Sequence, residues 1–481
     1  MRQTSLGFVL LALVCLPFAD LSTHVADPWL ELQRLGAGLL TPDIPSWSAI
    51  QLALFSTLAF AIQGVALGVF LGFLLSLGYA YVGIRLLAST LRSVHELFWA
   101  LLLLQVLGLS PLTGILALAL PYGGTFAKIY GELYEEADPR PRDALGERRR
   151  TLSGFFFAVL PLTLRPMAHY TAYRLECGIR SSAVLGFIGL PTLGYHLETA
   201  VRQGDYATGA FFFYALVALV ATLKLWLRPI LIPVYLLLAA IYLPPIAHPD
   251  WDLLRQFVTH DMVPAPFRGG GQWLPWLETL WQGQMLPGLK NTLILAILAF
   301  AATAAFTLIS FPFSSPLFGR PGSRVLAKGL MVLFRSAPEY LLAFLGLMIW
   351  GPSMLPGILA LSLHNGAIIG TLVSRYTRTL RLREDAATGM NRYFYEVLPR
   401  VYRQFLAYSL YRFEIILRET AILGVLGIPT LGFYIDSAFS EMRYDRAIIL
   451  LLLTAVLNIG VDVISRHLRL QLHLRTQPET L

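Results

Sequence analysis

The sequence predicts an all-α polytopic membrane protein made of two copies of one six-helix unit. Three observations lead to this prediction: an apolar composition, apolar segments long enough to cross a bilayer, and an internal repeat. The chain has 481 residues, of which 56% are hydrophobic and 14% charged, and its mean hydropathy is +0.63. Soluble domains carry about 25% charged residues, so this composition indicates that a membrane is the solvent.

Apolar segments of the required length occur along the whole chain. A spanning helix takes about 20 mostly apolar residues, and residues 58–80, 291–311 and 446–464 come close to that length or exceed it. We prefer helices to strands because a single helix satisfies its own backbone hydrogen bonds in lipid, and the alternation typical of membrane barrels is absent. We expect about 12 transmembrane helices, near 6–20, 53–80, 95–109, 111–130, 166–188, 206–226, 229–247, 288–311, 328–350, 354–374, 403–426 and 446–465.

The first apolar segment, Leu6 to Ala19, is short and follows Arg2, as in cleaved signal peptides. No small-x-small cleavage site follows it, so we favour a retained helix. The two cysteines, Cys15 and Cys177, both lie in apolar segments. They predict neither a disulfide framework nor a metal knuckle.

The internal repeat is the most informative feature of the sequence. Segments 160–194 and 398–432 share 16 identical positions out of 35 at an offset of 238 residues, and an upstream block repeats at an offset of 243. This period is far longer than that of a solenoid, so we expect a duplicated membrane domain with halves 1–228 and 229–481. The repeated residues include Tyr170/Tyr408, Tyr173/Tyr411, Arg174/Arg412, Glu176/Glu414, Arg180/Arg418, Arg92/Arg335, Glu96/Glu339 and Gly114/Gly357.

The net charge of +8 comes from arginines that gather in short loops, which is typical of membrane topology rather than of nucleic-acid binding. Loop 375–403 has seven arginines, and loop 128–165 has six arginines and a lysine. The loops around 20–50 and 248–286 are acid-biased. Because basic loops face the cytoplasm, we expect a multi-pass protein of the bacterial inner membrane with both termini cytoplasmic.

Each half has a long basic loop that ends in Leu-Pro, with small and acidic residues before it. Small residues allow a close helix approach, an acidic residue can pair with a basic partner, and glycine permits a bend. This arrangement resembles the EAA loop of ABC importer permeases, which docks on the ATPase subunit. The residues are Asp143, Ala144 and Gly146 in the first loop (about 131–165), and Glu384, Ala386, Ala387 and Gly389 in the second (about 375–403).

The fifth-helix block, the Arg-Ser-x-x-Glu motif and the Gly-Ile-Leu-Ala-Leu motif make the resemblance more specific. Over roughly 85–230 and 325–470 the chain resembles PhnE-like permeases of phosphonate and phosphite importers. The resemblance implies a duplicated type I (MetI-like) transmembrane domain, two copies of a cytoplasmic ATP-binding-cassette ATPase and a periplasmic substrate-binding protein as partners, and phosphonate or phosphite as substrate. Members of this group are often half-length homodimers, whereas this chain holds both halves.

The chain itself has no Gly-x-x-x-x-Gly-Lys-Ser/Thr loop for nucleotide binding. We therefore expect that it is not an enzyme and binds no cofactor, and that its partner ATPase binds ATP and Mg²⁺. Two other functions stay open, an ABC permease for another small solute and an ion-coupled secondary transporter. A membrane-embedded enzyme is disfavoured because the sequence shows no catalytic dyad or metal cluster.

Charged residues in the fifth helix of each half are candidates for a translocation path or gate, because charges inside a membrane are costly and usually functional. Guanidinium groups would pair well with an anionic substrate. A structural role is the alternative, with Glu176–Arg180 and Glu414–Arg418 as pairs four residues apart on one helix face. The candidates are Arg174, Glu176, Arg180, Arg412, Glu414 and Arg418.

The remaining polar and small residues receive structural interpretations. His169 and His364 lie in expected helices without metal-ligand spacing, so we expect hydrogen-bonded packing and no metal site. Pro191 and Pro429 are expected to end the fifth helices. Gly123 and Gly366 are expected to permit close helix packing.

Overall fold

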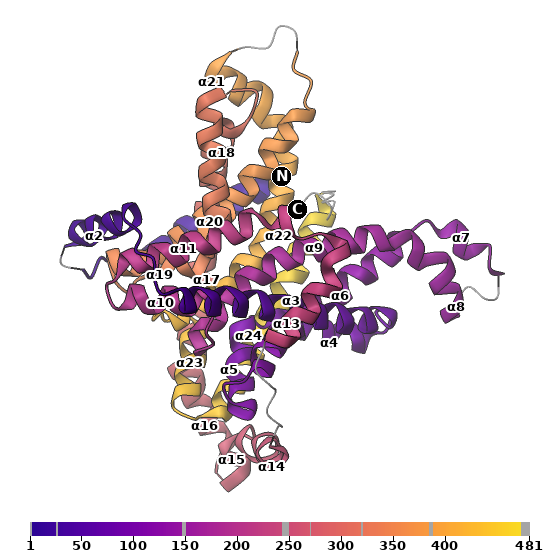
Figure 1. The fold of residues 1–481 in the computed structure, drawn as a ribbon, viewed down its shortest axis with the longest axis vertical. Helices are drawn as coiled ribbons and strands as arrows, with labels where there is room; N and C mark the ends of the chain where they lie inside the picture. Colours follow the sequence, from indigo (N-terminus) through magenta and orange to yellow (C-terminus); the bar gives the residue numbers. More distant parts are fainter. Residues whose placement is uncertain are drawn as a thin grey trace. The chain divides into compact units, whose positions relative to one another are not determined.

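The computed structural model describes residues 2–25, 27–146, 151–242, 250–269, 271–318, 321–383 and 388–472 (Figure 1). All regular elements within these ranges are helical, so the all-α class is confirmed. Among these residues five helices are long and apolar enough to cross a membrane, or eight if each of three bent pairs is one span. Three shorter apolar helices add to them, Thr4–Phe18, Tyr206–Ala221 and Ile232–Tyr242.

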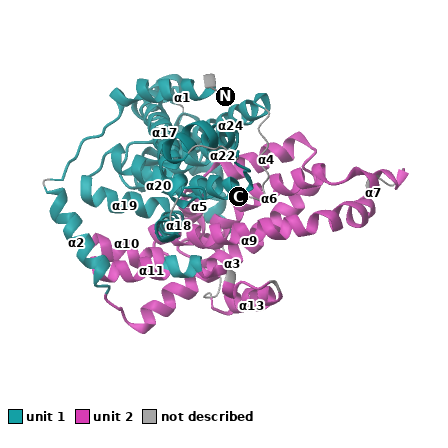
Figure 2. Cartoon of the chain, turned by 90° about the horizontal axis from the view of Figure 1, so that it is seen from above, with its two compact units in different colours: residues 1–42, 216–221, 251–481 teal, residues 43–215, 222–250 magenta. Residues whose placement is uncertain are grey.

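Two compact units make up the chain (Figure 2). Unit 1 comprises Met1–Pro42, Leu216–Ala221 and Trp251–Leu481, and unit 2 comprises Asp43–Ala215 and Thr222–Asp250. The α-helices of unit 2 are α3 (Trp47–Leu77), α4 (Val82–Ser93), α5 (Glu96–Leu107), α6 (Pro111–Glu136), α7 (Pro139–Asp143), α8 (Leu152–Gly154), α9 (Leu160–Val184), α10 (Leu193–Arg202), α12 (Leu223–Trp226) and α13 (Ile232–Tyr242). Helix α11 (Tyr206–Ala221) has its last six residues in unit 1.

Unit 1 holds most of the second repeat half together with the start of the chain. Its α-helices are α1 (Arg2–Cys15), α2 (Pro28–Leu40), α14 (Trp251–Gln256), α15 (Ala265–Gly269), α16 (Trp273–Leu280), α17 (Leu286–Ser314), α18 (Pro321–Ser336), α19 (Glu339–Trp350), α20 (Met354–Tyr376), α21 (Gly389–Asn391), α22 (Leu398–Val425), α23 (Leu431–Ser440) and α24 (Tyr444–Gln471). Two π-helical segments precede the fifth helices, η3 (Phe155–Val159) and η9 (Arg392–Val397).

The first helix of each repeat half packs in the unit that the other half mainly forms. In unit 1, α1 packs on α17, and the ring of Phe8 lies 4.9 Å from that of Phe300. In unit 2, α13 packs on α3, where the side chain of Gln63 donates to the carbonyl of Leu236 at 3.1 Å. The compact units therefore differ from a simple division of the sequence at residue 228, and that division stays a prediction about the duplication.

Close packing of α3 against α6 forms the centre of unit 2. Gly64, Gly68 and Gly72 are spaced by four residues and lie on one face of α3. A Cβ atom at Gly72 would lie 2.4 Å from the Cβ of Phe126, and at Gly68 it would lie 2.9 Å from the Cβ of Tyr122. Small residues at this spacing allow two membrane helices to approach closely, because van der Waals packing is what drives association in lipid.

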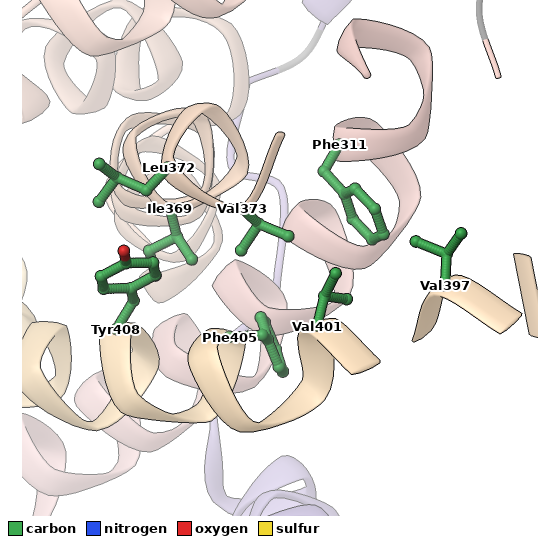
Figure 3. Packing of buried hydrophobic residues seen from close by; sticks show 8 residues of the cluster. All are labelled: Phe311, Ile369, Leu372, Val373, Val397, Val401, Phe405 and Tyr408. Carbon is green, nitrogen blue, oxygen red and sulfur yellow. The ribbon is translucent and has the colours of Figure 1, made fainter. Parts of the chain in front are cut away.

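A cluster of eight buried side chains joins α17, α20, η9 and α22 in unit 1 (Figure 3). Gly366 permits the approach of α20 to α17, since a Cβ atom there would lie 2.6 Å from the ring of Phe306. The expected packing role of Gly366 is thereby confirmed. The members of the cluster are Phe311, Ile369, Leu372, Val373, Val397, Val401, Phe405 and Tyr408.

The third span of each half is bent rather than straight. The sequence predicts one helix over 328–350, but the structure has two helices, α18 and α19, that meet at 95°. Pro338 explains the break, because a proline disfavours helical backbone at the residue before it. In the first half α4 and α5 meet at 92°, and only α5 corresponds to the predicted helix at 95–109.

The turn after the fifth helix has the same construction in both halves. Gly189 and Gly427 adopt φ values of +91° and +94°, which favour glycine. A Cβ atom at Gly432 would lie 1.8 Å from the carbonyl oxygen of Ala421, and at Gly194 it would lie 1.9 Å from that of Ala183. The chain thus doubles back tightly at Gly-x-Pro-Thr-Leu-Gly, and the predicted end of the fifth helix there is confirmed.

Replacing Gly432 by alanine tests this packing. We expect Gly432→Ala to destabilise the fold by roughly 1–3 kcal/mol, the usual cost of overpacking. The added methyl group would meet backbone atoms of Ala421, which cannot turn aside as a side chain could. The midpoint of thermal unfolding in detergent measures the effect. Gly460→Ala is the matched control, since a Cβ atom there meets nothing within 4 Å. Equal unfolding midpoints for the two variants would contradict the tight turn.

Candidate functional site: coupling loops and buried polar clusters

The second basic loop (about 375–403), a candidate coupling loop, begins and ends on packed structure in its described part. Glu384, Ala386 and Ala387 lie outside the described residues. Gly389 is the first residue of α21 and has a φ of +63°. A Cβ atom added at Gly389 would meet nothing within 4 Å. The loop therefore re-enters the fold through a glycine that has left-handed backbone and open space around it.

Hydrogen bonds draw the two ends of this loop together. The backbone N–H of Arg383 donates to Glu396 at 3.3 Å, and the guanidinium of Arg400 donates to the carbonyl of Arg381 at 2.7 Å. Arg400 also forms an ion pair with Glu396 at 2.5 Å. The hydroxyl of Tyr393 in η9 donates to the carbonyl of Leu308 in α17 at 3.0 Å. Contacts at the ends of the loop thus reach α17 and α22.

The first coupling loop leaves α6 and returns through α8 and η3. Asp143, Ala144 and Gly146 are solvent-exposed, and Gly146 has a φ of +56°. Arg140 pairs with Asp138 at 2.6 Å, and this hydrogen bonding holds the pKa of the Asp138 carboxyl below its usual range.

A cavity of about 260 Å³ lies beside this loop. Its wall has polar side chains from α3, α6 and the residue before α8, together with the aromatic face of Phe155. The Tyr134 ring packs edge-on against Phe155 at 4.8 Å. The residues of the wall with polar side chains are Ser76, Tyr79, Tyr134, Glu135 and Thr151.

The two candidate arginines on α9 contact aromatic and sulfur groups of α9 and α6. Arg174 donates to the hydroxyl of Tyr170 at 2.7 Å, and its guanidinium lies over the rings of Tyr170 and Tyr122 at 5.3 and 5.9 Å. Arg180 donates to the sulfur of Cys177 at 3.4 Å. Glu176 is half-buried. The expected pairing of Glu176 with Arg180 stays a prediction.

A buried carboxylate stands at the bend of the third span in the first half. Glu96 is the first residue of α5 and is 8% exposed. The hydroxyl of Ser181 on α9 donates to it at 2.5 Å, and the hydroxyl of Tyr122 on α6 lies 3.3 Å from that of Ser181. The chain from Glu96 through Ser181 to Tyr122 joins three spans of unit 2 by polar contacts.

The second half builds an equivalent cluster from different residues. Glu339 is the first residue of α19, at the repeat position of Glu96, and its carboxylate lies 3.6 Å from Nε2 of His364 on α20. The side chain of Asn365 donates to Glu419 at 2.9 Å. Arg412, only 6% exposed, donates to the amide oxygen of Asn365 at 3.4 Å.

The structure thus brings Arg412 to a polar cluster, whereas Arg418 and Glu414 are half-buried on α22. Their expected pairing with each other stays a prediction. Sequence reasoning missed Asn365 as a partner of Arg412, and Glu419 as a partner of Asn365. Glu96 and Glu339 carried a usable signal, since both are repeated acidic residues that precede an apolar segment.

Comparison with known proteins places this architecture among transport permeases. No protein-family model matches the chain. The phosphate-import permease protein PhnE of Mycolicibacterium smegmatis is 23% identical over 425 residues, which cover 81% of this chain and 77% of that protein. The phosphite transport system permease protein PtxC of Stutzerimonas stutzeri is 28% identical over 228 residues, which cover 44% of this chain and 81% of that protein.

The two coverages agree with the internal duplication. A match over 81% of the chain is longer than either repeat half, whereas PtxC matches over a length close to one half. The chain is a multi-pass membrane protein similar to import permeases of the phosphonate and phosphite group. The resemblance drawn from its own motifs is therefore confirmed.

Proposed function

We propose that this chain is the membrane permease of an ATP-binding-cassette importer, and that it carries phosphonate-like oxyanions such as phosphonate or phosphite across the bacterial inner membrane. The main support is similarity over 81% of the chain to a phosphate-import permease. A phosphite permease matches over nearly half of the chain. The substrates that these two names give, phosphate and phosphite, are both small phosphorus oxyanions.

Two ATPase subunits would supply the energy, one at each coupling loop, and both termini would face the cytoplasm with these loops. The loops support this assignment because each carries a left-handed glycine, Gly146 or Gly389, and each returns through a π-helical segment into a fifth helix. A periplasmic binding protein would deliver the anion from the opposite side. In this arrangement ATP and Mg²⁺ are bound only by the ATPase subunits.

The arginines of the fifth helices are the proposed anion contacts or gate of the path. Guanidinium groups hold oxyanions through parallel N–H donors. Support comes from the way in which two of them are positioned: Arg412 by Asn365, and Arg174 by the Tyr170 hydroxyl. A buried arginine that is already oriented loses less freedom when it binds an anion. Arg180 and Arg418 would act with them, and Glu176 and Glu414 would balance their charge.

Uptake into proteoliposomes tests the function. The purified chain is reconstituted with its candidate ATPase and binding protein, and labelled phosphonate and phosphite are offered separately. We expect ATP-dependent uptake that stops when either partner is omitted, because in this proposal the ATPase supplies the energy and the binding protein delivers the anion. Uptake by the chain alone along a proton or sodium gradient would instead establish a secondary transporter. ATP-dependent uptake of a different solute would leave the importer intact and refute the substrate.

Substituting the loop glycines tests the coupling role. Left-handed backbone costs a non-glycine residue about 1–2 kcal/mol, so Gly389→Ala should weaken ATPase docking by roughly 5- to 30-fold. Binding of the ATPase to the reconstituted chain measures the effect, and Gly146→Ala repeats the test on the first loop. Gly329→Ala is the control, since a Cβ atom there meets nothing within 4 Å and no positive φ is involved. Unchanged docking in both loop variants would refute the role of the loops.

A further inference from the structure

Three potential metal ligands meet in unit 1 where α19, α20 and α22 pack together. They are Glu339, His364 and Glu419, and one ligand atom of each lies within 4.8 Å of the others. His364 is 2% exposed and Glu419 is 7% exposed. The sequence did not predict this cluster, because its members are separated by 25 and 55 residues.

The hydrogen bonds of His364 fix which ring nitrogen can act as a ligand. Its Nδ1 lies 2.9 Å from the carbonyl oxygen of Ala337 and 3.2 Å from that of Phe334. A carbonyl oxygen only accepts, so Nδ1 carries the proton, and in the neutral ring Nε2 presents a lone pair. This Nε2 lies 3.6 Å from Oε2 of Glu339. A metal ion or a proton between Nε2 and this carboxylate would satisfy both groups.

The cluster of the first half is built differently. The backbone N–H of Leu97 donates to Nδ1 of His95 at 3.2 Å, so the other ring nitrogen carries the proton. That nitrogen lies 3.8 Å from Glu96, as a donor facing an acceptor. Ser181 occupies the repeat position of Glu419 and donates to the same carboxylate. The first half therefore has one carboxylate and protein donors, whereas the second half has two carboxylates and a histidine lone pair.

We propose that Glu339, His364 and Glu419 bind a divalent transition-metal cation of the zinc class. One imidazole nitrogen and two carboxylates suit zinc, which takes three protein ligands and a fourth from water. Tetrahedral ligands about 2.0–2.1 Å from the ion lie about 3.4 Å apart, close to the 3.6 Å between Nε2 and Oε2. Calcium and magnesium prefer six or more oxygen ligands and fit less well.

The groups behind the ligands support the same conclusion. The Ala337 carbonyl orients the His364 ring, and the Asn365 amide donates to one oxygen of Glu419 at 2.9 Å. Histidine and carboxylate ligands of metal sites are generally held by such outer contacts. The positive charge of Arg412 is directed to the Asn365 oxygen. A metal here would cross-link three spans of the second half at the bend of α18 and α19.

Metal content of the purified full-length chain tests the proposal. The chain in lipid nanodiscs is stripped with a chelator, equilibrated with Zn²⁺ or Co²⁺ and freed of excess metal. We expect about one tightly held ion per chain and, with Co²⁺, visible absorption of a tetrahedral site. Glu419→Gln and His364→Phe should lose the ion. Asn365→Ala keeps all three ligands and should weaken the affinity by roughly 10- to 100-fold.

His95→Ala in the first half is the matched control and should keep the ion. Gel filtration of each variant shows whether it is folded, and Asn365→Ala provides the test if the ligand variants aggregate. Equal metal retention in all variants would overturn the proposal, since the ion would then lie elsewhere. A wild-type chain that retains no metal would overturn it too, and a shared proton would then hold the three groups together. Metal content is measured without transport, so failure here is distinguishable from failure of the proposed function.

Discussion

A carboxylate buried among membrane helices has to be met by donors or cations, because lipid offers neither. Glu96 and Glu339 place this constraint at the same point of each half, where the third span bends by 92° or 95°. The fourth and fifth spans satisfy it, through Tyr122 and Ser181 in unit 2. His364, Asn365 and Glu419 form the polar contacts in unit 1. The bend, the packing of the fifth helix and the position of its arginines are thus parts of one arrangement.

The two halves keep the backbone of this arrangement and differ in its polar detail. Both have the glycine turn after the fifth helix and a hydroxyl that accepts the backbone N–H of the next helix, Thr57 for Leu193 and Thr292 for Leu431. Their polar clusters differ, however, because Ser181 in the first half stands at the repeat position that Glu419 occupies in the second half. Fusion of two copies in one chain permits such divergence, because each copy can then carry substitutions that the other lacks. A homodimer would have to place the same side chains in both halves.

Much of the fold could be predicted from the sequence, because apolar length and the repeat are properties of the chain itself. The fifth helix α22 has six charged residues, so length and composition alone do not identify it as a membrane span. The repeat nevertheless predicted this helix. The bend between α18 and α19 was missed, although Pro338 marks it. The convergence of Glu339, His364 and Glu419 was not predictable, because it depends on how three spans pack. The exchange of first helices between the compact units depends on packing in the same way.

The central proposal is that one chain supplies both permease halves of an ATP-driven importer. To test this proposal, the chain is purified in complex with its ATPase, bound lipid and nucleotide are removed, and the mass of the complex is measured. We predict one copy of this chain with two ATPase subunits, one for each coupling loop. Two copies of the chain with two ATPase subunits would show that only one loop of each chain docks, and a chain that binds no ATPase would contradict the importer itself.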